Sequence, residues 1–178
     1  MERRIVIGDI HGCYCTLKKL LEENVKITTK DTLYFVGDYV DRGPRSREVL
    51  DYIIQLKWEG YKTYPLRGNH EELMIKAILN EDYMHAWYNN GAEETLKSFD
   101  VPENILFEYE GIRQIPDRYI QFIEGLPYYY VANNYLIVHA GFNFNIDDIF
   151  EDKESMIWIR DMKYEHDKDG QKTIVNGH

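Results

Sequence analysis

Cysteine is scarce in this sequence, and its scarcity excludes one way of stabilising a fold. The chain has 178 residues and only two cysteines, Cys13 and Cys15. Residues so close in sequence do not form an unstrained disulfide bond, so a disulfide framework is excluded. We therefore expect a reducing, cytoplasmic environment, with both thiols as small buried side chains near the start of a helix.

Long hydrophobic runs and an excess of positive charge are also absent. No apolar stretch approaches the roughly 20 residues that cross a bilayer, and the N-terminal residues MERRIVIGDIHG resemble no signal peptide, so we expect no membrane partner. The chain has 21 Lys and Arg against 31 Asp and Glu. Nucleic-acid-binding proteins usually present a basic surface, so we expect no nucleic-acid partner. The sequence gives no indication of the oligomeric state.

Hydrophobic residues are plentiful and follow an alternating rhythm. They make up 44% of the chain, enough for the core of a single α/β domain over residues 1–178. Short β-branched runs at 4–7, 32–38 and 61–68 predict strands, and the intervening segments have apolar residues at helical spacing, such as Leu17, Leu20 and Leu21. Strand–helix–strand units that recur at roughly 30 residues predict a mostly parallel sheet.

The second half of the chain has a mixed pattern. Residues 71–99 look helical, and 116–126 form another predicted helix with Pro116 near its first turn. The segment YYYVANNYLIVHAG reads as two strands joined at Asn133 and Asn134, a pair that tolerates a tight hairpin turn. TIVNGH is a last strand. The charged residues 151–170 are expected to form an exposed surface segment, which the mostly apolar residues 156–160 interrupt.

Polar side chains recur where the predicted strands end. The turns GDIHG, GD, GNHE, HAG and GH each follow an apolar run, and the carboxyl ends of strands in an open α/β sheet gather along one edge. These turns offer oxygen and imidazole ligands but no thiolate, which suits Mn, Fe or Zn. Two ions about 3.5–4 Å apart would share Asp38 as a bridge. The candidate metal ligands are Asp9, His11, Asp38, Asn69, His139 and His178.

The stretch VGDYVDRG places two further charged residues, Asp41 and Arg42, close to this predicted site. Arg42 has the planar fork that matches phosphate oxygens, so we expect it to face the substrate. Asp41 is expected to hydrogen-bond His70 and to keep the ring cationic or correctly oriented. Each turn alone also has a purely structural interpretation: Asn69 as a helix cap, for example, with Glu71 in the first turn. Five such turns, all after strands, favour the metal site.

These motifs together resemble the phosphoprotein phosphatase branch of the calcineurin-like metallophosphoesterases, over residues 8–178. WYNNGAEETLKSF and FIEGLPYYYVANNYLIVHAG resemble the small bacterial and bacteriophage serine/threonine protein phosphatases. The resemblance implies a central β-sandwich flanked by helices and two divalent ions, Mn above all, with Fe, Zn or Ni as alternatives. Relatives continue past the last Gly-His, so we expect the final strands of the sandwich to be missing from this chain.

The resemblance also implies a role for each motif residue. Asp9, His11 and Asp38 would hold one ion, and Asp38, Asn69, His139 and His178 the other. Arg42 and Arg160 would clamp the phosphate, with Asn69 also contacting it. His70, paired with Asp41, would protonate the leaving oxygen.

The expected reaction is hydrolysis of phosphoserine or phosphothreonine, with phosphotyrosine as a further substrate, by direct attack of a hydroxide that bridges the ions. The alternative is symmetrical hydrolysis of dinucleoside polyphosphates such as diadenosine tetraphosphate. A catalytically inactive binding module is a third, less favoured reading. A phosphoprotein or a dinucleoside polyphosphate is thus the expected partner.

Overall fold

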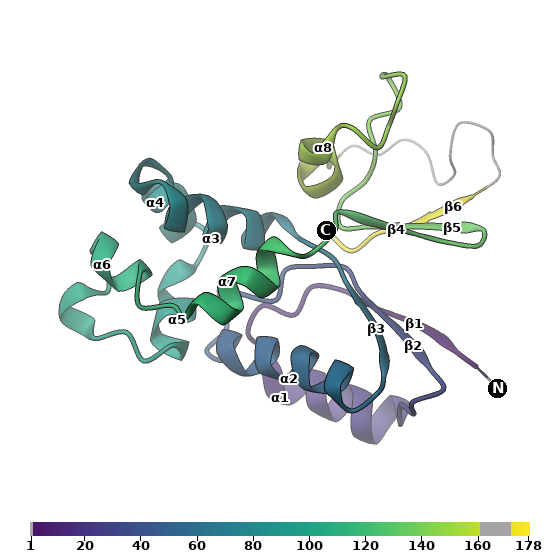
Figure 1. The fold of residues 1–178 in the computed structure, drawn as a ribbon, viewed down its shortest axis with the longest axis horizontal. Helices are drawn as coiled ribbons and strands as arrows, with labels where there is room; N and C mark the ends of the chain where they lie inside the picture. Colours follow the sequence, from purple (N-terminus) through teal and green to yellow (C-terminus); the bar gives the residue numbers. More distant parts are fainter. Residues whose placement is uncertain (1, 161–171) are drawn as a thin grey trace.

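The first half of the chain forms a parallel sheet with helices on one face (Figure 1). The computed structural model describes residues 2–160 and 172–178. Strands pair in the order β1-β2-β3, and Leu33 of β2 lies opposite Ile5 and Thr63. The predicted βαβ units are thereby confirmed. The elements are β1 (Arg4–Ile7), α1 (Tyr14–Lys19), its π-helical continuation η1 (Leu20–Val25), β2 (Thr32–Phe35), α2 (Ser46–Trp58) and β3 (Lys62–Pro65).

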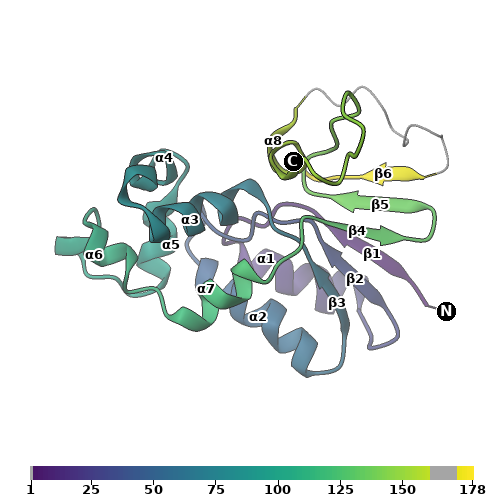
Figure 2. The ribbon, with the colours of Figure 1, turned by 45° about the horizontal axis from the view of Figure 1, so that its top comes forward.

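A second sheet lies against the other face of the first (Figures 1 and 2). Its strands β4 (Tyr129–Ala132) and β5 (Tyr135–Val138) form the predicted antiparallel hairpin, and β6 (Thr173–Val175) runs parallel to β5. Asn133 adopts the left-handed conformation that the turn requires, with φ of 54°. The predicted hairpin strands and the predicted last strand are therefore all present.

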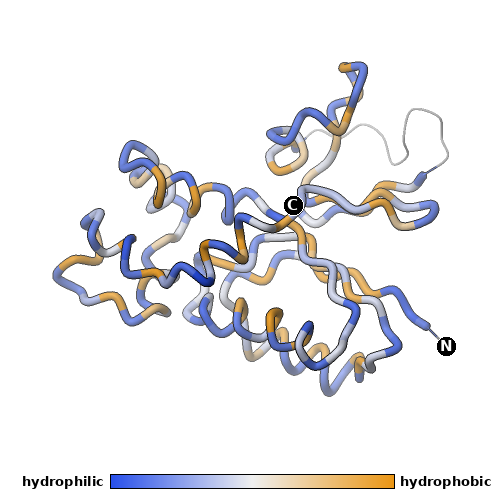
Figure 3. The backbone as a smooth tube through the Cα atoms, in the orientation of Figure 1, coloured by the Kyte–Doolittle hydropathy of each residue, from blue (hydrophilic) through white to orange (hydrophobic). Residues whose placement is uncertain are grey.

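Hydrophobic layers hold the two sheets and the helices together. Buried side chains between the sheets include Tyr34 and Val36 from the first sheet and Ala132 and Ile137 from the second. On the opposite face, hydrophobic positions recur along α2 with hydrophilic positions between them (Figure 3). Burial of this apolar surface is the main favourable term in folding. The predicted β-sandwich flanked by helices is confirmed.

Between β3 and β4 the chain forms a helical unit that extends beyond the end of the sheet (Figure 1). Trp87, Leu96 and Tyr119 are fully buried in it and join the core beneath the first sheet. Helix α8 (Lys153–Trp158) lies between β5 and β6 in the chain and interrupts the charged segment 151–170, whose residues 161–170 lie outside the described part. The unit comprises α3 (Asn69–Leu79), η2 (Glu81–Tyr83), α4 (Met84–Tyr88), α5 (Ala92–Ser98), η3 (Glu103–Ile105), α6 (Tyr109–Ile112) and α7 (Asp117–Glu124).

Two details of the first helix differ from the sequence-based expectations. Cys13 and Cys15 are exposed rather than buried, and Cys15 Sγ accepts a hydrogen bond from Arg45 Nη1 at 3.2 Å. Leu20, expected on the apolar face, is 42% exposed. Leu17 and Leu21 alone face the core, because the helix widens to π geometry from residue 20 onward and changes the spacing of its faces. Within the described ranges, no helix has both the length and the apolar character to cross a membrane.

Candidate metal centre

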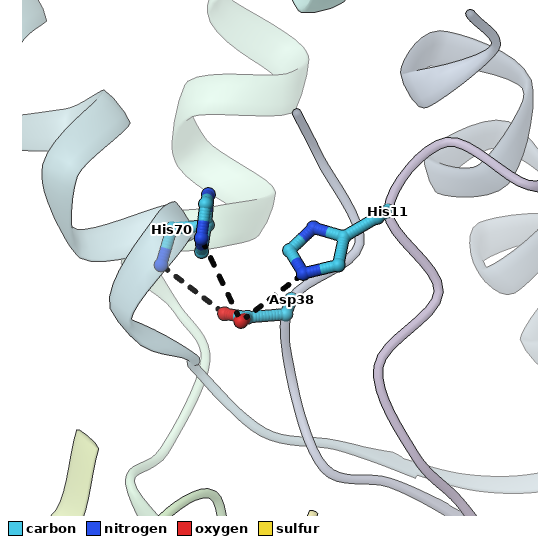
Figure 4. A group of neighbouring side chains, drawn as sticks. All are labelled: His11, Asp38 and His70. Atoms are coloured by element: carbon cyan, nitrogen blue, oxygen red, sulfur yellow. Dashed lines mark hydrogen bonds and ion pairs between the residues drawn. The ribbon is translucent and has the colours of Figure 1, made fainter. Parts of the chain in front are cut away.

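The loops after β1 and β2 are joined by backbone hydrogen bonds. The carbonyl oxygen of Asp38 accepts from the N–H groups of Ile10 and His11, each at 2.9 Å. Asp38 and His11 both have positive φ values, 54° and 44°. These conformations are uncommon outside glycine and persist only where the surroundings fix them. The paired loops supply that support and aim His11 and Asp38 at the same point (Figure 4).

Glycine allows the loops after β2 and β3 to approach closely. A Cβ atom on Gly37 would lie 2.6 Å from Gly68 Cα, and one on Gly68 would lie 2.2 Å from Asp38 Oδ1. Real side chains do not fit at these distances, so only glycine brings Asp38 next to Asn69. The glycines before the two predicted ligands thus determine how close the ligands lie.

Glu71 is a functional residue that sequence reasoning missed. Its fully buried carboxylate accepts hydrogen bonds from the backbone N–H groups of Asp38 at 2.8 Å, Tyr39 at 2.7 Å and Gly68 at 2.9 Å. The motif GNHE suggested only a favourable charge in the first turn of α3. The bonds to the neighbouring loop depend on tertiary packing, so no local signal revealed them. Glu71 fastens the two loops that supply Asp38 and Asn69.

Two of the predicted imidazole ligands have a defined orientation. His11 Nδ1 donates to the carbonyl oxygen of Val40, and His139 Nδ1 donates to that of Val36, each at 2.8 Å. Each neutral ring therefore has its lone pair on Nε2, which faces the site. Burial lowers the pKa of His11 and lowers that of His139 to about 3, so both rings are neutral at neutral pH. Neutral imidazole is the form that binds metals.

One group of predicted ligands surrounds His139 Nε2. This atom lies 2.9 Å from Asn69 Oδ1, 3.0 Å from His178 Nδ1 and 3.5 Å from Asp38 Oδ1. A proton on His178 Nδ1 would satisfy only one of these contacts and leaves two oxygens facing a lone pair. His178 Nε2 is also buried without a hydrogen-bond partner. Several acceptor atoms thus point at one place without enough protons to form hydrogen bonds among themselves. A cation bound there would satisfy all of them, so these residues fit a metal ion.

The second group comprises His11, Asp38 and His70 (Figure 4). Asp38 Oδ2 lies 3.6 Å from His11 Nε2 and 3.9 Å from His70 Nε2. Burial, and then the charge of Glu71, raise the pKa of Asp38 to about 9, and the hydrogen bond that its Oδ1 accepts from the backbone N–H of His70 at 3.1 Å compensates its negative charge only in part. A divalent cation would supply the rest. Because Oδ1 faces one group and Oδ2 the other, Asp38 has the geometry of a bridging ligand.

Arg42 lies within the second group. Its Nη1 is 2.8 Å from His11 Nε2, and its Nη2 is 3.0 Å from His70 Nε2. The guanidinium is a donor only, so it donates to both imidazole lone pairs. A lone pair accepts one partner at a time, and an ion on His11 would therefore displace Arg42 Nη1. Arg42 is thus close enough to contact a substrate at this centre.

The predicted contact between Asp41 and His70 is present. His70 Nδ1 donates to Asp41 Oδ2 at 2.7 Å, and both side chains are buried. Burial lowers the pKa of His70 to about 4 and raises that of Asp41 to about 7. Of the two roles that the sequence suggested for Asp41, burial opposes a cationic ring, and the hydrogen bond favours orientation of the neutral ring.

Asp9 and Arg160 lie at the edge of the site. Asp9 is exposed and belongs to neither group, although its Oδ1 is 3.4 Å from where a Cβ of Gly177 would be. Arg160 is also exposed, and its positive charge contributes, after burial, to the lowered pKa of His178. Apart from Asp9 and Arg160, the residues that the sequence predicted for the site therefore lie close together around Asp38.

Comparison with known proteins adds information on family and relatives. The sequence model of the family described as calcineurin-like phosphoesterase matches residues 3–178. A symmetrical bis(5'-nucleosyl)-tetraphosphatase from Photorhabdus laumondii is 48% identical over 66 residues, which are 37% of this chain and 23% of that protein. The Vibrio cholerae protein of the same name is 38% identical over 74 residues, 42% of this chain and 26% of that protein. The matched segments thus cover about a quarter of these relatives.

Solved structures share the fold. A protein serine/threonine phosphatase from Saccharomyces cerevisiae has a TM-score of 0.58 and 24% identity, over 89% of this chain and 51% of that one. A putative diadenosine tetraphosphatase has a TM-score of 0.53 and 23% identity, over 79% and 55%. At such identities the likeness concerns the fold alone. The family match spans almost the whole sequence, and the chain therefore belongs to the calcineurin-like phosphoesterase family.

Proposed function

We propose that this chain hydrolyses phosphoryl bonds with the help of two divalent cations, and that its substrates are dinucleoside polyphosphates, in which water cleaves the central phosphoanhydride bond and releases two equal halves. The observation that carries the metal-dependent reaction is the arrangement around Asp38. Its two oxygens face two separate groups of imidazole nitrogens, at 3.6 Å and 3.5 Å, with no protons to link them. Such a centre has little structural purpose without cations.

The proposed ligands divide between the two ions as follows. Asp9, His11 and Asp38 hold one ion, and Asp38, Asn69, His139 and His178 hold the other. The mixed oxygen and nitrogen donors suit Mn, and also Fe, Zn or Ni. When bound, two such ions polarise a phosphoryl oxygen and lower the pKa of a coordinated water.

The remaining side chains orient the substrate and move protons. Arg42 and Arg160 bind phosphate oxygens through their guanidinium groups, and Asn69 also contacts the phosphate. His70 takes up a proton at Nε2 and gives it to the leaving oxygen. Asp41 accepts the hydrogen bond from Nδ1 of His70 and stabilises the ring while it is charged.

The choice of substrate rests on the named relatives. Sequence analysis favoured phosphoproteins, with dinucleoside polyphosphates as the alternative. Relatives that are 48% and 38% identical over their matched segments are named symmetrical bis(5'-nucleosyl)-tetraphosphatases, which supports the alternative. The solved structures include a protein phosphatase and a putative diadenosine tetraphosphatase, so the fold alone does not separate the two substrates.

A direct comparison of substrates tests the proposal. The chain is incubated with Mn²⁺ and either diadenosine tetraphosphate or a phosphoserine peptide, and nucleotides and inorganic phosphate are quantified. We expect two molecules of ADP per dinucleotide and a higher kcat/KM for this substrate than for the peptide. A preference for the peptide would establish a protein phosphatase instead, and turnover of neither would refute phosphoester hydrolysis. Asp38→Asn serves as the inactive control.

A further inference from the structure

We propose that Trp87 and Thr95 are positioning residues, which hold the carboxylate of Asp41 and through it set the orientation of the His70 ring. This inference rests on the proposed function, because it assigns His70 a part in proton transfer. Neither residue was singled out by its sequence motif. Both belong to the helical unit that connects β3 to β4 in the chain: Trp87 lies in α4 and Thr95 in α5.

The carboxylate of Asp41 is surrounded by donors. Trp87 Nε1 lies 3.0 Å from Oδ1 and 2.9 Å from Oδ2, and Thr95 Oγ1 lies 2.7 Å from Oδ1. His70 Nδ1 completes the set at Oδ2. All four side chains are buried, and none exceeds 1% exposure. A buried carboxylate is unfavourable unless hydrogen bonds compensate it, and these three donors do so.

The directions of these hydrogen bonds follow from counting protons. The backbone N–H of Asp41 donates to Thr95 Oγ1 at 2.7 Å, so the single hydroxyl proton of Thr95 is left for Asp41 Oδ1. Ser46 Oγ, at 3.1 Å, therefore donates to Thr95. The indole N–H of Trp87 only donates. Asp41 thus accepts on both oxygens, which requires the proton of the His70 ring to be on Nδ1 and leaves Nε2 facing the metal centre.

The same helical unit also supports the backbone at this position. Asp41 and Arg42 both have left-handed conformations, with φ of 71° and 66°. The N–H of Arg42 donates to the carbonyl oxygen of Gly91, in the turn between α4 and α5, at 3.2 Å. A Cβ atom on Gly91 would lie 2.9 Å from the Arg42 nitrogen, so the turn approaches as closely as glycine allows. The helical unit therefore orients Asp41 from both its side chain and its backbone.

The first test observes the hydrogen bond itself by NMR. In the wild-type chain the proton on His70 Nδ1 should give a resonance far downfield, which His70→Gln removes and so identifies. Trp87→Phe and Thr95→Val keep most of the volume but remove a donor, and should shift this resonance upfield or broaden it. Thr95→Ser keeps the hydroxyl and should restore it. The matched control is Trp58→Phe, because Trp58 is 87% exposed on α2.

The second test separates positioning from general loss of structure. Each variant is assayed with phenyl phosphate, whose leaving group needs a proton, and with p-nitrophenyl phosphate, whose leaving group departs without one. Positioning of His70 should lower kcat about tenfold for the first ester, with KM unchanged, because complete general acid catalysis contributes roughly 10²–10⁴-fold. The second ester should be affected much less.

The outcomes are distinct. A resonance that is unchanged in both Trp87→Phe and Thr95→Val, or an equal loss of kcat on both esters, would overturn the inference. If the wild-type chain cleaved the dinucleotide but neither ester, the proposed function would stand; if it cleaved none of the three, the proposed function would fail. In both cases the NMR result alone would decide whether Trp87 and Thr95 orient His70.

Discussion

Asn69 Oδ1 lies 2.9 Å from His139 Nε2, and neither atom has a proton, because the ring proton of His139 is bonded to Val36. The opposite amide orientation would let the Asn69 nitrogen donate to His139 Nε2 at 2.9 Å and to Asp38 at 3.2 Å. Without an ion the opposite orientation therefore satisfies more of these contacts, whereas a cation between Asp38, Asn69 and His139 would favour the amide oxygen facing inward.

Removing the Asn69 amide should remove one of the two ions. In Asn69→Ala we expect metal content to fall by about one ion per chain and kcat/KM to fall roughly 100-fold or more, since even outer partners of metal ligands contribute roughly 10–100-fold. Elemental analysis and a turnover assay measure both quantities. Asn89→Ala, a change at an exposed residue that ends α4, is the control. Full metal content with wild-type turnover in Asn69→Ala would contradict the ligand assignment.

Removal of the metal ions by a chelator should lower the thermal stability of the wild type, and this effect should require Asp38. An ion bound only by the folded state at roughly 100 times its Kd adds about 2.7 kcal/mol, which is about 5–10 °C in Tm for a chain of this length. Thermal unfolding with and without EDTA measures the difference, which Asp38→Asn should abolish. In EDTA this variant should melt at or above the wild type, because burial raises the pKa of Asp38 to about 9 and its charge is unfavourable at neutral pH. Equal Tm values for the wild type in both conditions would refute this prediction.

Gly68 should not tolerate a methyl group, whereas Gly8 should. Each precedes a predicted ligand, yet a Cβ on Gly68 would lie 2.2 Å from Asp38 Oδ1, and one on Gly8 would have no atom within 4 Å. We expect Gly68→Ala to lose metal and activity and Gly8→Ala to keep both. Metal titration by calorimetry checks the pair. Similar affinities in the two variants would show that the close approach of the loops does not matter.

Glu71→Gln should weaken the link between the loops after β2 and β3. The amide NH₂ of glutamine would face backbone donors that the carboxylate now accepts, and loss of buried hydrogen bonds to a charged group costs about 2–3 kcal/mol. Urea unfolding monitored by circular dichroism gives the free energy of unfolding. The control is Glu94→Gln, which loses only an exposed ion pair with Lys97 and should change stability by less than about 1 kcal/mol. Equal effects in the two variants would rule out the proposed role of Glu71.

Asp31 should make stability depend on acidic pH. Hydrogen bonds from Arg3, and further bonds from Thr28, hold the pKa of this carboxylate well below its usual range. Because the folded-state pKa is depressed, the contribution is complete above the unfolded value of about 3.9 and is lost as pH falls below it. The Tm difference between wild type and Asp31→Asn should be constant near neutrality and shrink below about pH 4. A difference independent of pH down to pH 2.5 would contradict this account.

Much of the site followed from the sequence because it depends on strand ends. Polar turns after β1 and β2 meet at one edge of the first sheet, and the turn after β5 joins them because the second sheet packs against the first. The pairing of Asp41 with His70 needed only neighbouring loops. Trp87 and Thr95 could not be found in this way, because Thr95 reaches Asp41 from 54 positions along the chain through the packing of short helices. The exposure of Leu20 likewise accompanies the π-helical widening after α1, which the apolar spacing does not encode.

His139 connects the two sheets of the sandwich through its ring, and its carbonyl oxygen holds the chain end that follows β6 in its own sheet. Its ring binds Val36 at the end of β2, and its carbonyl oxygen accepts from the N–H groups of Gly177 and His178 at 2.9 and 3.0 Å. Separation of the sheets would therefore also separate the proposed ligands. If the proposed ion binds there, we expect metal binding and the packing of the two sheets to be thermodynamically linked, each favouring the other.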